Sequence, residues 1–167
     1  MRLQPVLLEI SVKPLYTANK HMRTWTQYLV LISVAGLLHF VWESLHLQLY
    51  SNYEALGSGW TLILFATFGD MMYTLLIVLF IALVHGRLEW IQQPKRNDFM
   101  AIAFLGGLVA CMVEYKALAL HRWGYATAMP IVPLLGVGLS PLLQMMLLTP
   151  LSVYVSRLGR VYSVKAL

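Results

Sequence analysis

One apolar segment of the sequence contains the stretch HFVWESLHLQL, residues 39–49, in which three ionisable side chains interrupt residues suited to a membrane. At helical pitch His39, Glu43 and His46 lie four and then three residues apart, so they project from one face of one helix. Ionisable groups at bilayer depth are costly unless they face protein or a water-filled cavity. We therefore predict that the chain folds around this face and that the face belongs to a functional site.

The composition is that of an integral membrane protein. The 167 residues are 59% hydrophobic and 11% charged, with a mean hydropathy of +0.70, which lies outside the range of soluble domains. The net charge of +5 would suit a nucleic-acid partner, but the basic residues sit at the ends of apolar runs, so we expect no nucleic acid. The single cysteine, Cys111, excludes a disulfide within the chain.

The apolar runs predict an all-α fold, a four-helix transmembrane bundle in a domain of residues 25–155. Each run is long enough for the roughly 20 residues that cross a bilayer. Short polar loops separate the runs and leave no room for a separate soluble domain. The predicted spans are residues 25–47, 60–84, 99–120 and 129–155.

Small and helix-breaking residues predict two features of the packing. Gly106 and Gly107 in the third span would let a neighbouring helix approach closely. The fourth span holds so much proline that we expect it to be kinked or locally unwound. Its prolines are Pro130, Pro133, Pro141 and Pro150.

The basic residues orient the bundle. Of the 12 Lys and Arg residues, all but Lys116 and Arg122 lie in the N-terminal segment, the 85–98 loop or the C-terminal region. Positively charged loops face the cytoplasm, so we expect both termini there, with residues 1–24 a cytoplasmic or interfacial segment and 156–167 a cytoplasmic tail. Residues 1–24 show neither a continuous apolar core nor a cleavage site, so no cleaved signal peptide is expected.

With that orientation, polar residues of the separate spans converge in the outer half of the bundle and predict a common pocket. Acid–base chemistry needs two carboxyl groups, or a carboxyl and an imidazole, in different environments. We predict that Glu43 and Asp70 act as proton donor and acceptor, with His39 tuning Glu43. An aromatic face could stabilise a transient cation. The predicted substrate-binding residues are Trp42, His46, Tyr73, Glu114 and Gln144.

Two metal-based alternatives stay open at this point. Glu43-x-x-His46 has the spacing that di-iron bundles take from two helices, but a second copy is absent because Glu114 and His121 are seven residues apart. A mononuclear site is compatible with the ligand types. Haem would need axial imidazoles, for which His39 and His121 are candidates at different depths. We assign no metal and no cofactor.

Three further interpretations use the same residues differently. A proton-coupled or ion-conducting transport module would use the acids as a relay and, with four spans, would need further copies of the chain as a homo-oligomer. A scaffold subunit of a larger membrane complex would need no site. In the structural interpretation each polar residue is satisfied locally: Asp70 by Tyr or Thr, His39 by a carbonyl, and Glu114 by Lys116 or Arg122.

The order of these residues resembles a known superfamily. His39-x-x-x-Glu43 followed by Leu49-Tyr50, then Asp70 and Glu114, is similar to the pattern of the emopamil-binding or EXPERA superfamily. The resemblance implies a small helical membrane protein that binds a sterol or shifts a sterol double bond, with His39, Glu43 and Asp70 moving the proton. The Asn and Trp of that family's later span are missing here, where Gln144 is the nearest polar replacement.

A second resemblance covers residues 36–155. Trp42-Glu43, Gly69-Asp70 and the segments MPIVP (129–133) and GLSPLLQ (138–144) are similar to uncharacterised four-span bacterial membrane proteins. This implies a place in a bacterial inner membrane and no particular activity. The expected partner is a membrane lipid or another small hydrophobic ligand, of sterol-like or isoprenoid type.

Overall fold

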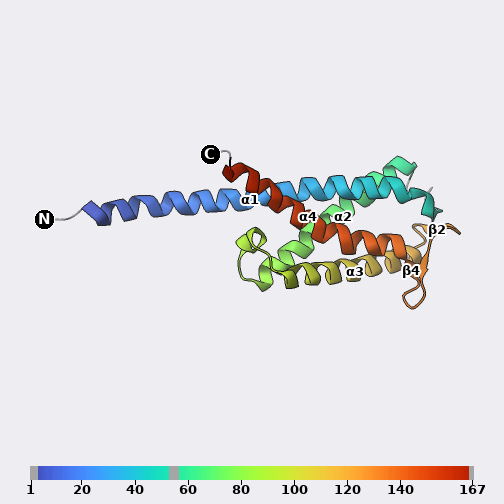
Figure 1. Cartoon of the computed structure of the whole chain (residues 1–167). Helices are drawn as coiled ribbons and strands as arrows, with labels where there is room; N and C mark the ends of the chain where they lie inside the picture. Colours follow the sequence, from blue (N-terminus) through green and yellow to red (C-terminus); the bar gives the residue numbers. More distant parts are fainter. Residues whose placement is uncertain (1–3, 53–56, 166–167) are drawn as a thin grey trace.

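The computed structural model describes the backbone of residues 4–52 and 57–165 and the side chains of residues 22–52 and 57–158. Within that part of the chain four long helices form an all-α bundle (Figure 1). Each contains a segment long and apolar enough to cross a membrane, and the chain is an integral membrane protein. The helices are α1 (Gln4–His46), α2 (Gly59–Val84), α3 (Arg96–Ala119) and α4 (Leu139–Lys165).

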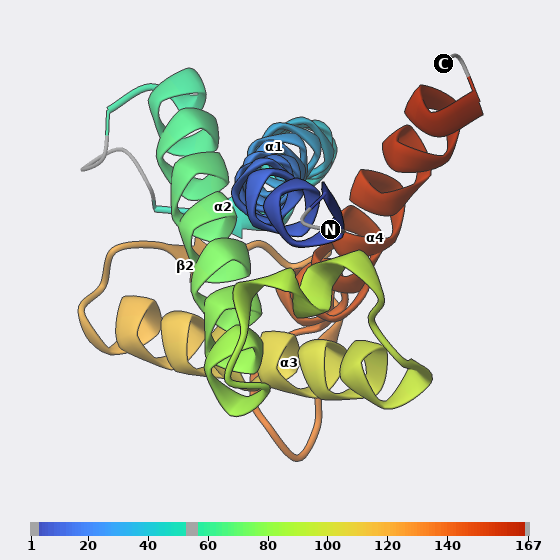
Figure 2. The same cartoon turned by 90° about the vertical axis from the view of Figure 1, so that its left-hand side faces the viewer.

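Helix α1 lies between α2 and α4, and α3 packs mainly against α4 (Figure 2). Helices α2 and α3 touch each other less than α2 touches α1 or α3 touches α4. The backbone of α1 continues without a break from Gln4. The side chains of residues 1–21 and 159–167 lie outside the described residues. Most of the predicted interfacial segment (1–24) and of the predicted cytoplasmic tail (156–167) falls on them.

The apolar core is concentrated at the end of the bundle away from the short strands. There the short helix η3 (Leu88–Gln92) inserts Trp90 and Ile91 between α1 and α2, and Gln27 holds it by donating to the carbonyl oxygen of Ile91 at 2.9 Å. Large apolar side chains face outward along the helices, as expected where lipid rather than water surrounds a bundle. Outward-facing examples are Leu29, Phe68, Leu83 and Phe104.

The predicted small-residue surface is confirmed. A Cβ atom added at Gly106 would lie 2.5 Å from the carbonyl oxygen of Met145, and one added at Gly107 would lie 3.1 Å from the side chain of Met146. Only glycine allows α3 and α4 to approach this closely. The close approach fixes the position of α4 along the axis of α3.

The predicted start of the fourth span is wrong. Helix α4 begins at Leu139, and the residues before it form an antiparallel pair of β3 (Ile131–Val132) and β4 (Val137–Gly138). Pro130 and Pro133 cannot donate backbone hydrogen bonds, and Gly136 turns the chain with a φ of 64°, so the apolar character of this segment does not make it helical. Pro141 sits in the first turn of α4, where no donor is needed. Pro150 lies inside α4, and the kink stays a prediction.

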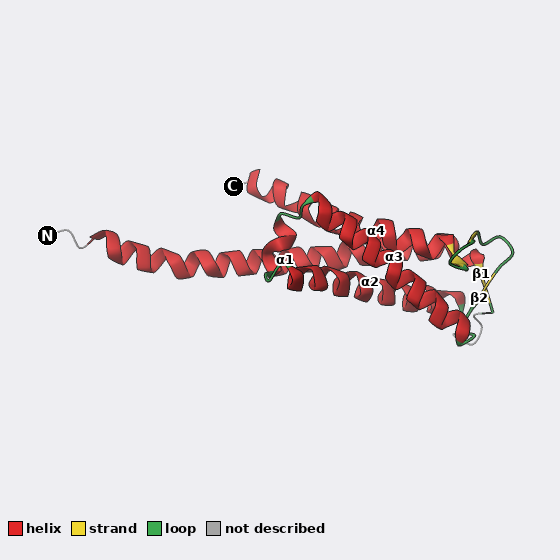
Figure 3. Cartoon of the chain, turned by 90° about the horizontal axis from the view of Figure 1, so that it is seen from below, coloured by secondary structure: helices red, strands yellow, loops and turns green. Residues whose placement is uncertain are grey.

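Short strands close one end of the bundle. β1 (Tyr50–Ser51) follows the short helix η1 (Leu47–Leu49) and pairs antiparallel with β2 (Gly124–Tyr125), which places Tyr50 opposite Tyr125. We call this end, formed by residues 47–52 and 120–138, the strand end (Figure 3). It lies opposite the end that carries η3 and the start of α3.

Candidate functional site

The polar face of α1 points into the bundle as predicted. His39 is fully buried, and Glu43 and His46 are 8% and 6% exposed. Their neighbours on the opposite face of the helix, such as Val41 and Leu45, are exposed. These exposed fractions confirm the prediction that the three residues share one buried face of α1.

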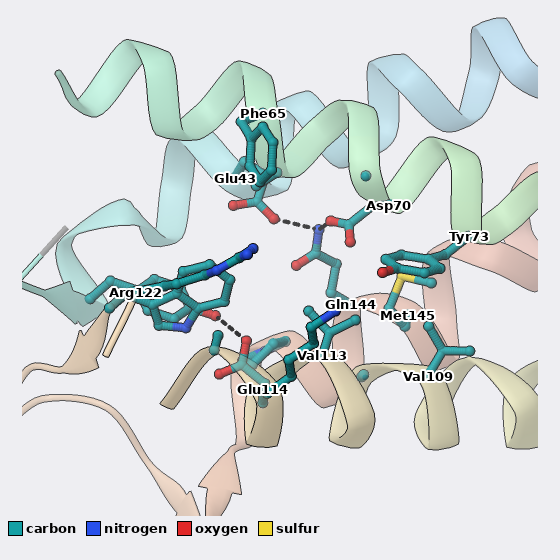
Figure 4. Close-up of a pocket in the computed structure, with 18 of the residues that line it drawn as sticks. Glu43, Phe65, Asp70, Tyr73, Val109, Val113, Glu114, Arg122, Gln144 and Met145 are labelled. Carbon is teal, nitrogen blue, oxygen red and sulfur yellow. Dashed lines mark hydrogen bonds between the residues drawn. The ribbon is translucent and has the colours of Figure 1, made fainter. Parts of the chain in front are cut away.

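Gln144 on α4 joins three of the buried groups. Its Nε2 donates to Glu43 Oε1 at 2.8 Å and to Asp70 Oδ2 at 2.7 Å (Figure 4). The same nitrogen lies 3.1 Å from His39 Nδ1. A primary amide has two hydrogens, which cannot fully serve three acceptors. A proton on one of the carboxyl groups would relieve this deficit.

A second set of hydrogen bonds supports Glu43 from the strand end. His46 Nε2 lies 3.2 Å from Glu43 Oε2, and Ser140 Oγ lies 2.9 Å from His46 Nδ1. In these contacts Nε2 of His46 can donate to Glu43, and Nδ1 can accept from the serine hydroxyl. Glu43 thus accepts hydrogen bonds at both of its oxygens.

The network continues toward the middle of the bundle through threonines. His39 Nε2 lies 3.2 Å from Thr74 Oγ1, which lies 3.3 Å from Thr149 Oγ1. His39 Nδ1 is 3.6 Å from Asp70 Oδ2. His39 is held on both nitrogens by side chains rather than by the backbone carbonyl considered in the structural interpretation.

Glu114 on α3 is also buried, but its partners are tyrosines rather than Lys116 or Arg122. It accepts from Tyr125 at 2.5 Å and from Tyr50 at 3.3 Å. The pairing of β1 with β2 brings these two phenols together. Burial raises the pKa of Tyr50 and of Tyr125 above the ordinary value, and the nearby Glu114 raises both further. Both phenols therefore stay neutral donors.

A pocket of about 180 Å³ lies between α2 and α3 and reaches down to α1 and α4. The carboxyl groups of Glu43, Asp70 and Glu114 share it with apolar side chains (Figure 4). Phe65 and Tyr73, on the α2 wall, are 57% and 37% exposed, so the pocket reaches the side of the bundle. The apolar part of its wall includes Leu62, Phe65, Val109, Val113 and Met145.

The structure brings together most of the residues predicted from sequence. Glu43, Asp70, Tyr73, Glu114 and Gln144 line the pocket. The other three lie on α1 behind this lining: His39 and His46 bind the acids or the amide, and Trp42 packs edge-on against His46 with ring centroids 6.1 Å apart. The predicted convergence of these side chains is confirmed, whereas the compartment they face stays a prediction.

Several residues of the site were missed. Thr74 follows Tyr73 in an apolar run and gives no signal beyond its own polarity. Tyr50 and Tyr125 lie opposite each other because β1 pairs with β2, and no sequence pattern predicted this pairing. Lys116 and Arg122 were considered as partners of Glu114 and instead line the pocket. Within the described residues, no three His, Cys, Asp or Glu side chains are arranged to share a metal ion.

Comparisons of the chain with protein-family models, with curated proteins and with solved structures each find no match. The site's geometry therefore carries the functional argument.

Proposed function

We propose that the chain is an intramembrane lipid-binding protein that moves a proton within its ligand, shifting a carbon–carbon double bond of an isoprenoid or sterol-like lipid. The observation that carries the proposal is the meeting of Glu43 and Asp70 at one nitrogen of Gln144, on the wall of an apolar pocket. The EXPERA resemblance names the same two acids.

The hydrogen bonds support a division of labour between the two acids. Two carboxylates on one donor repel each other, and one shared proton removes that repulsion. Glu43 accepts from both Gln144 and His46, which favours its ionised form, whereas among the described residues Asp70 accepts only from the side chain of Gln144. We therefore assign Asp70 as the proton donor and Glu43 as the acceptor, the reverse of the order expected from sequence.

The reaction balances without a redox partner. Asp70 adds its proton to one carbon of a double bond and leaves a cation on the next carbon. Glu43 removes a proton from the carbon beyond, and a new double bond forms. The ring of Tyr73, which lines the pocket three residues after Asp70, stabilises the cation. Glu43 then passes its proton directly to Asp70, whose carboxyl group is within side-chain hydrogen-bonding reach.

The size of the pocket favours a flexible chain. Pockets that enclose drug-sized ligands measure about 300–1,000 Å³, whereas this one measures about 180 Å³. One part of a lipid therefore enters, while the rest stays in the bilayer between α2 and α3. An isoprenoid unit meets this requirement more easily than four fused sterol rings.

The transport alternative would need a polar route to both ends of the bundle. In the described residues, side-chain hydrogen bonds lead from Ser140 through the acids to Thr149 and end there. Ser152 and Ser156, the next buried polar residues on α4, donate to carbonyl oxygens of their own helix. The connected network is therefore one-sided, which favours binding and catalysis over conduction.

The proposal is tested by mass spectrometry in deuterated water. The detergent-solubilised protein is incubated with the lipids that co-purify with it and with unsaturated isoprenoids, and deuterium gain at carbon is measured. Wild type should label the lipid, and Glu43→Gln and Asp70→Asn should each reduce labelling by a factor of roughly 100 to 10,000, the usual contribution of a general acid or base. The lipid-facing variant Ser44→Ala is the control. Equal labelling in wild type and both acid variants would exclude the enzyme, and co-purification without labelling would leave a binding protein.

A further inference from the structure

Two cations line the pocket together with the acids, and neither has a side-chain partner among the described residues. Lys116 is on α3, three residues before its end, and Arg122 is in the turn that follows. Neither makes a hydrogen bond or ion pair through its side chain with any residue that the structure describes. The acid nearest in sequence, Glu114, is already bound to two phenols.

We propose that Lys116 and Arg122 form a phosphate-binding subsite at the mouth of the pocket, and that the ligand is an isoprenoid lipid that carries a phosphate group. This inference rests on the proposed function, because it names the substrate class of the same pocket. It adds a polar recognition element to an otherwise apolar and acidic lining.

The backbone holds Arg122 in place. His121 adopts a left-handed φ of 51°, and the amides of His121 and Arg122 donate to the carbonyl oxygens of Leu118 and Ala117. This is the Schellman arrangement that ends helices, usually with glycine at the left-handed position. The turn reverses the chain so that Arg122 extends over the pocket, as Figure 4 shows.

The placement of charge matches a lipid with a charged head. Arg122 lies in the strand end and Lys116 beside it in the last turn of α3, whereas Asp70 and Gln144 lie further inside their helices. The first turn of α4 also lines the pocket at Pro141, and helix N-termini attract anions. A phosphate at the mouth would leave the first carbons of the chain beside the acids.

The chemistry of the two cations favours phosphate. A phosphate monoester carries a charge of about −1.5 to −2 near neutral pH, which two cations offset. Arginine binds two phosphate oxygens with its planar fork, and lysine adds a point charge. Because the pocket of about 180 Å³ takes only a small group, the head and the first unit of the chain fill it.

The test measures binding to the full-length protein in detergent, with three probes: farnesyl monophosphate, farnesol and inorganic phosphate. Charge-assisted hydrogen bonds contribute enough that wild type should bind the phosphorylated lipid at least about 10-fold more tightly than the alcohol. Lys116→Gln/Arg122→Gln should reduce this preference to below about 2-fold and leave farnesol binding unchanged. The matched control, Arg87→Gln/Arg96→Gln, removes the same charge at the other end and should keep the preference.

The outcomes separate this inference from the proposed function. Equal binding of farnesol and its phosphate by wild type would overturn the subsite and leave the lipid pocket intact. Binding of neither lipid would overturn both. Inorganic phosphate that binds as tightly as the lipid phosphate would show a site for the free anion and also overturn the inference. If Lys116→Gln/Arg122→Gln misfolds, the charge-preserving Lys116→Arg/Arg122→Lys must retain the preference, and its loss would overturn the subsite.

Discussion

The carboxyl groups of Glu43 on α1 and Asp70 on α2 meet at a single nitrogen atom, Nε2 of Gln144 on α4. Three helices therefore depend on one amide for the arrangement of their buried polar groups. Removing either partner of a buried hydrogen bond leaves the other unsatisfied, which makes this meeting point a sensitive target for substitution.

Gln144→Leu keeps the size of the side chain and removes the shared donor. We expect a loss of about 1–3 kcal/mol in the free energy of unfolding, because Glu43 and Asp70 lose their common partner. Asp70→Asn in the same background should recover part of the loss, because the asparagine amide has two N–H donors and can donate to Glu43 in place of Gln144. Unfolding of the two single variants and the double variant in detergent measures the coupling, and strictly additive losses would contradict a shared contact.

Gly106→Ala tests the close approach of α3 and α4. The added methyl would lie 2.5 Å from the carbonyl oxygen of Met145, so the helices must separate, at a cost of about 1–3 kcal/mol. Gly69→Ala is the matched control, because a Cβ there meets nothing within 4 Å. In a helix interior that change should stabilise by up to about 1 kcal/mol. Thermal unfolding of both variants should show opposite signs, and two equal shifts would refute the packing argument.

His121→Gly should stabilise the protein. A left-handed conformation costs a non-glycine residue about 1–2 kcal/mol, and glycine avoids this cost. The neighbouring Leu120→Gly, at a φ of −91°, should destabilise instead. Chemical unfolding of the two solubilised variants measures whether their free energies of unfolding change in these opposite directions. A less stable His121→Gly would mean that the imidazole makes a contribution larger than the backbone strain.

The tyrosines that bind Glu114 predict a loss of stability at alkaline pH. Folding raises the pKa of Tyr125 above its ordinary value of 10.0, mainly through burial. The folded state thus holds this proton more tightly. The contribution of Tyr125 to the free energy of unfolding is therefore complete below about pH 10 and falls as the pH rises toward the folded-state pKa. Thermal unfolding from pH 8 upward should show this fall, and Tyr125→Phe should make it shallower. An unchanged slope in that variant would exclude Tyr125 as its source.

The helical periodicity of residues 39–46 was enough to predict the buried face of α1, because the spacing of residues along one helix determines the side from which their side chains project. The hydropathy of the spans likewise predicted the helical bundle. Gln144 was identifiable as a polar residue in an apolar span, although its role in joining Glu43 and Asp70 depends on how α4 packs against α1 and α2.

Features that depend on contacts distant in sequence were missed. In the structural interpretation Glu114 would pair with Lys116 or Arg122, which are close to it in sequence, yet the pairing of β1 with β2 supplies Tyr50 and Tyr125 instead. The fourth span was predicted to start at residue 129 because residues 129–138 are apolar. The prolines lack a backbone hydrogen-bond donor and Gly136 turns the chain, so this segment is not helical and α4 starts at Leu139.

The most direct test of the central claim is infrared spectroscopy of the carboxyl groups at neutral pH in the ligand-free, solubilised protein. A shared proton predicts the carbonyl stretch of a protonated carboxylic acid in wild type, a band that disappears in Asp70→Asn and persists in Glu114→Gln. If wild type shows no such band, or if the same band survives in Asp70→Asn, Asp70 does not hold the proton, and the assignment of the two acids as donor and acceptor is contradicted.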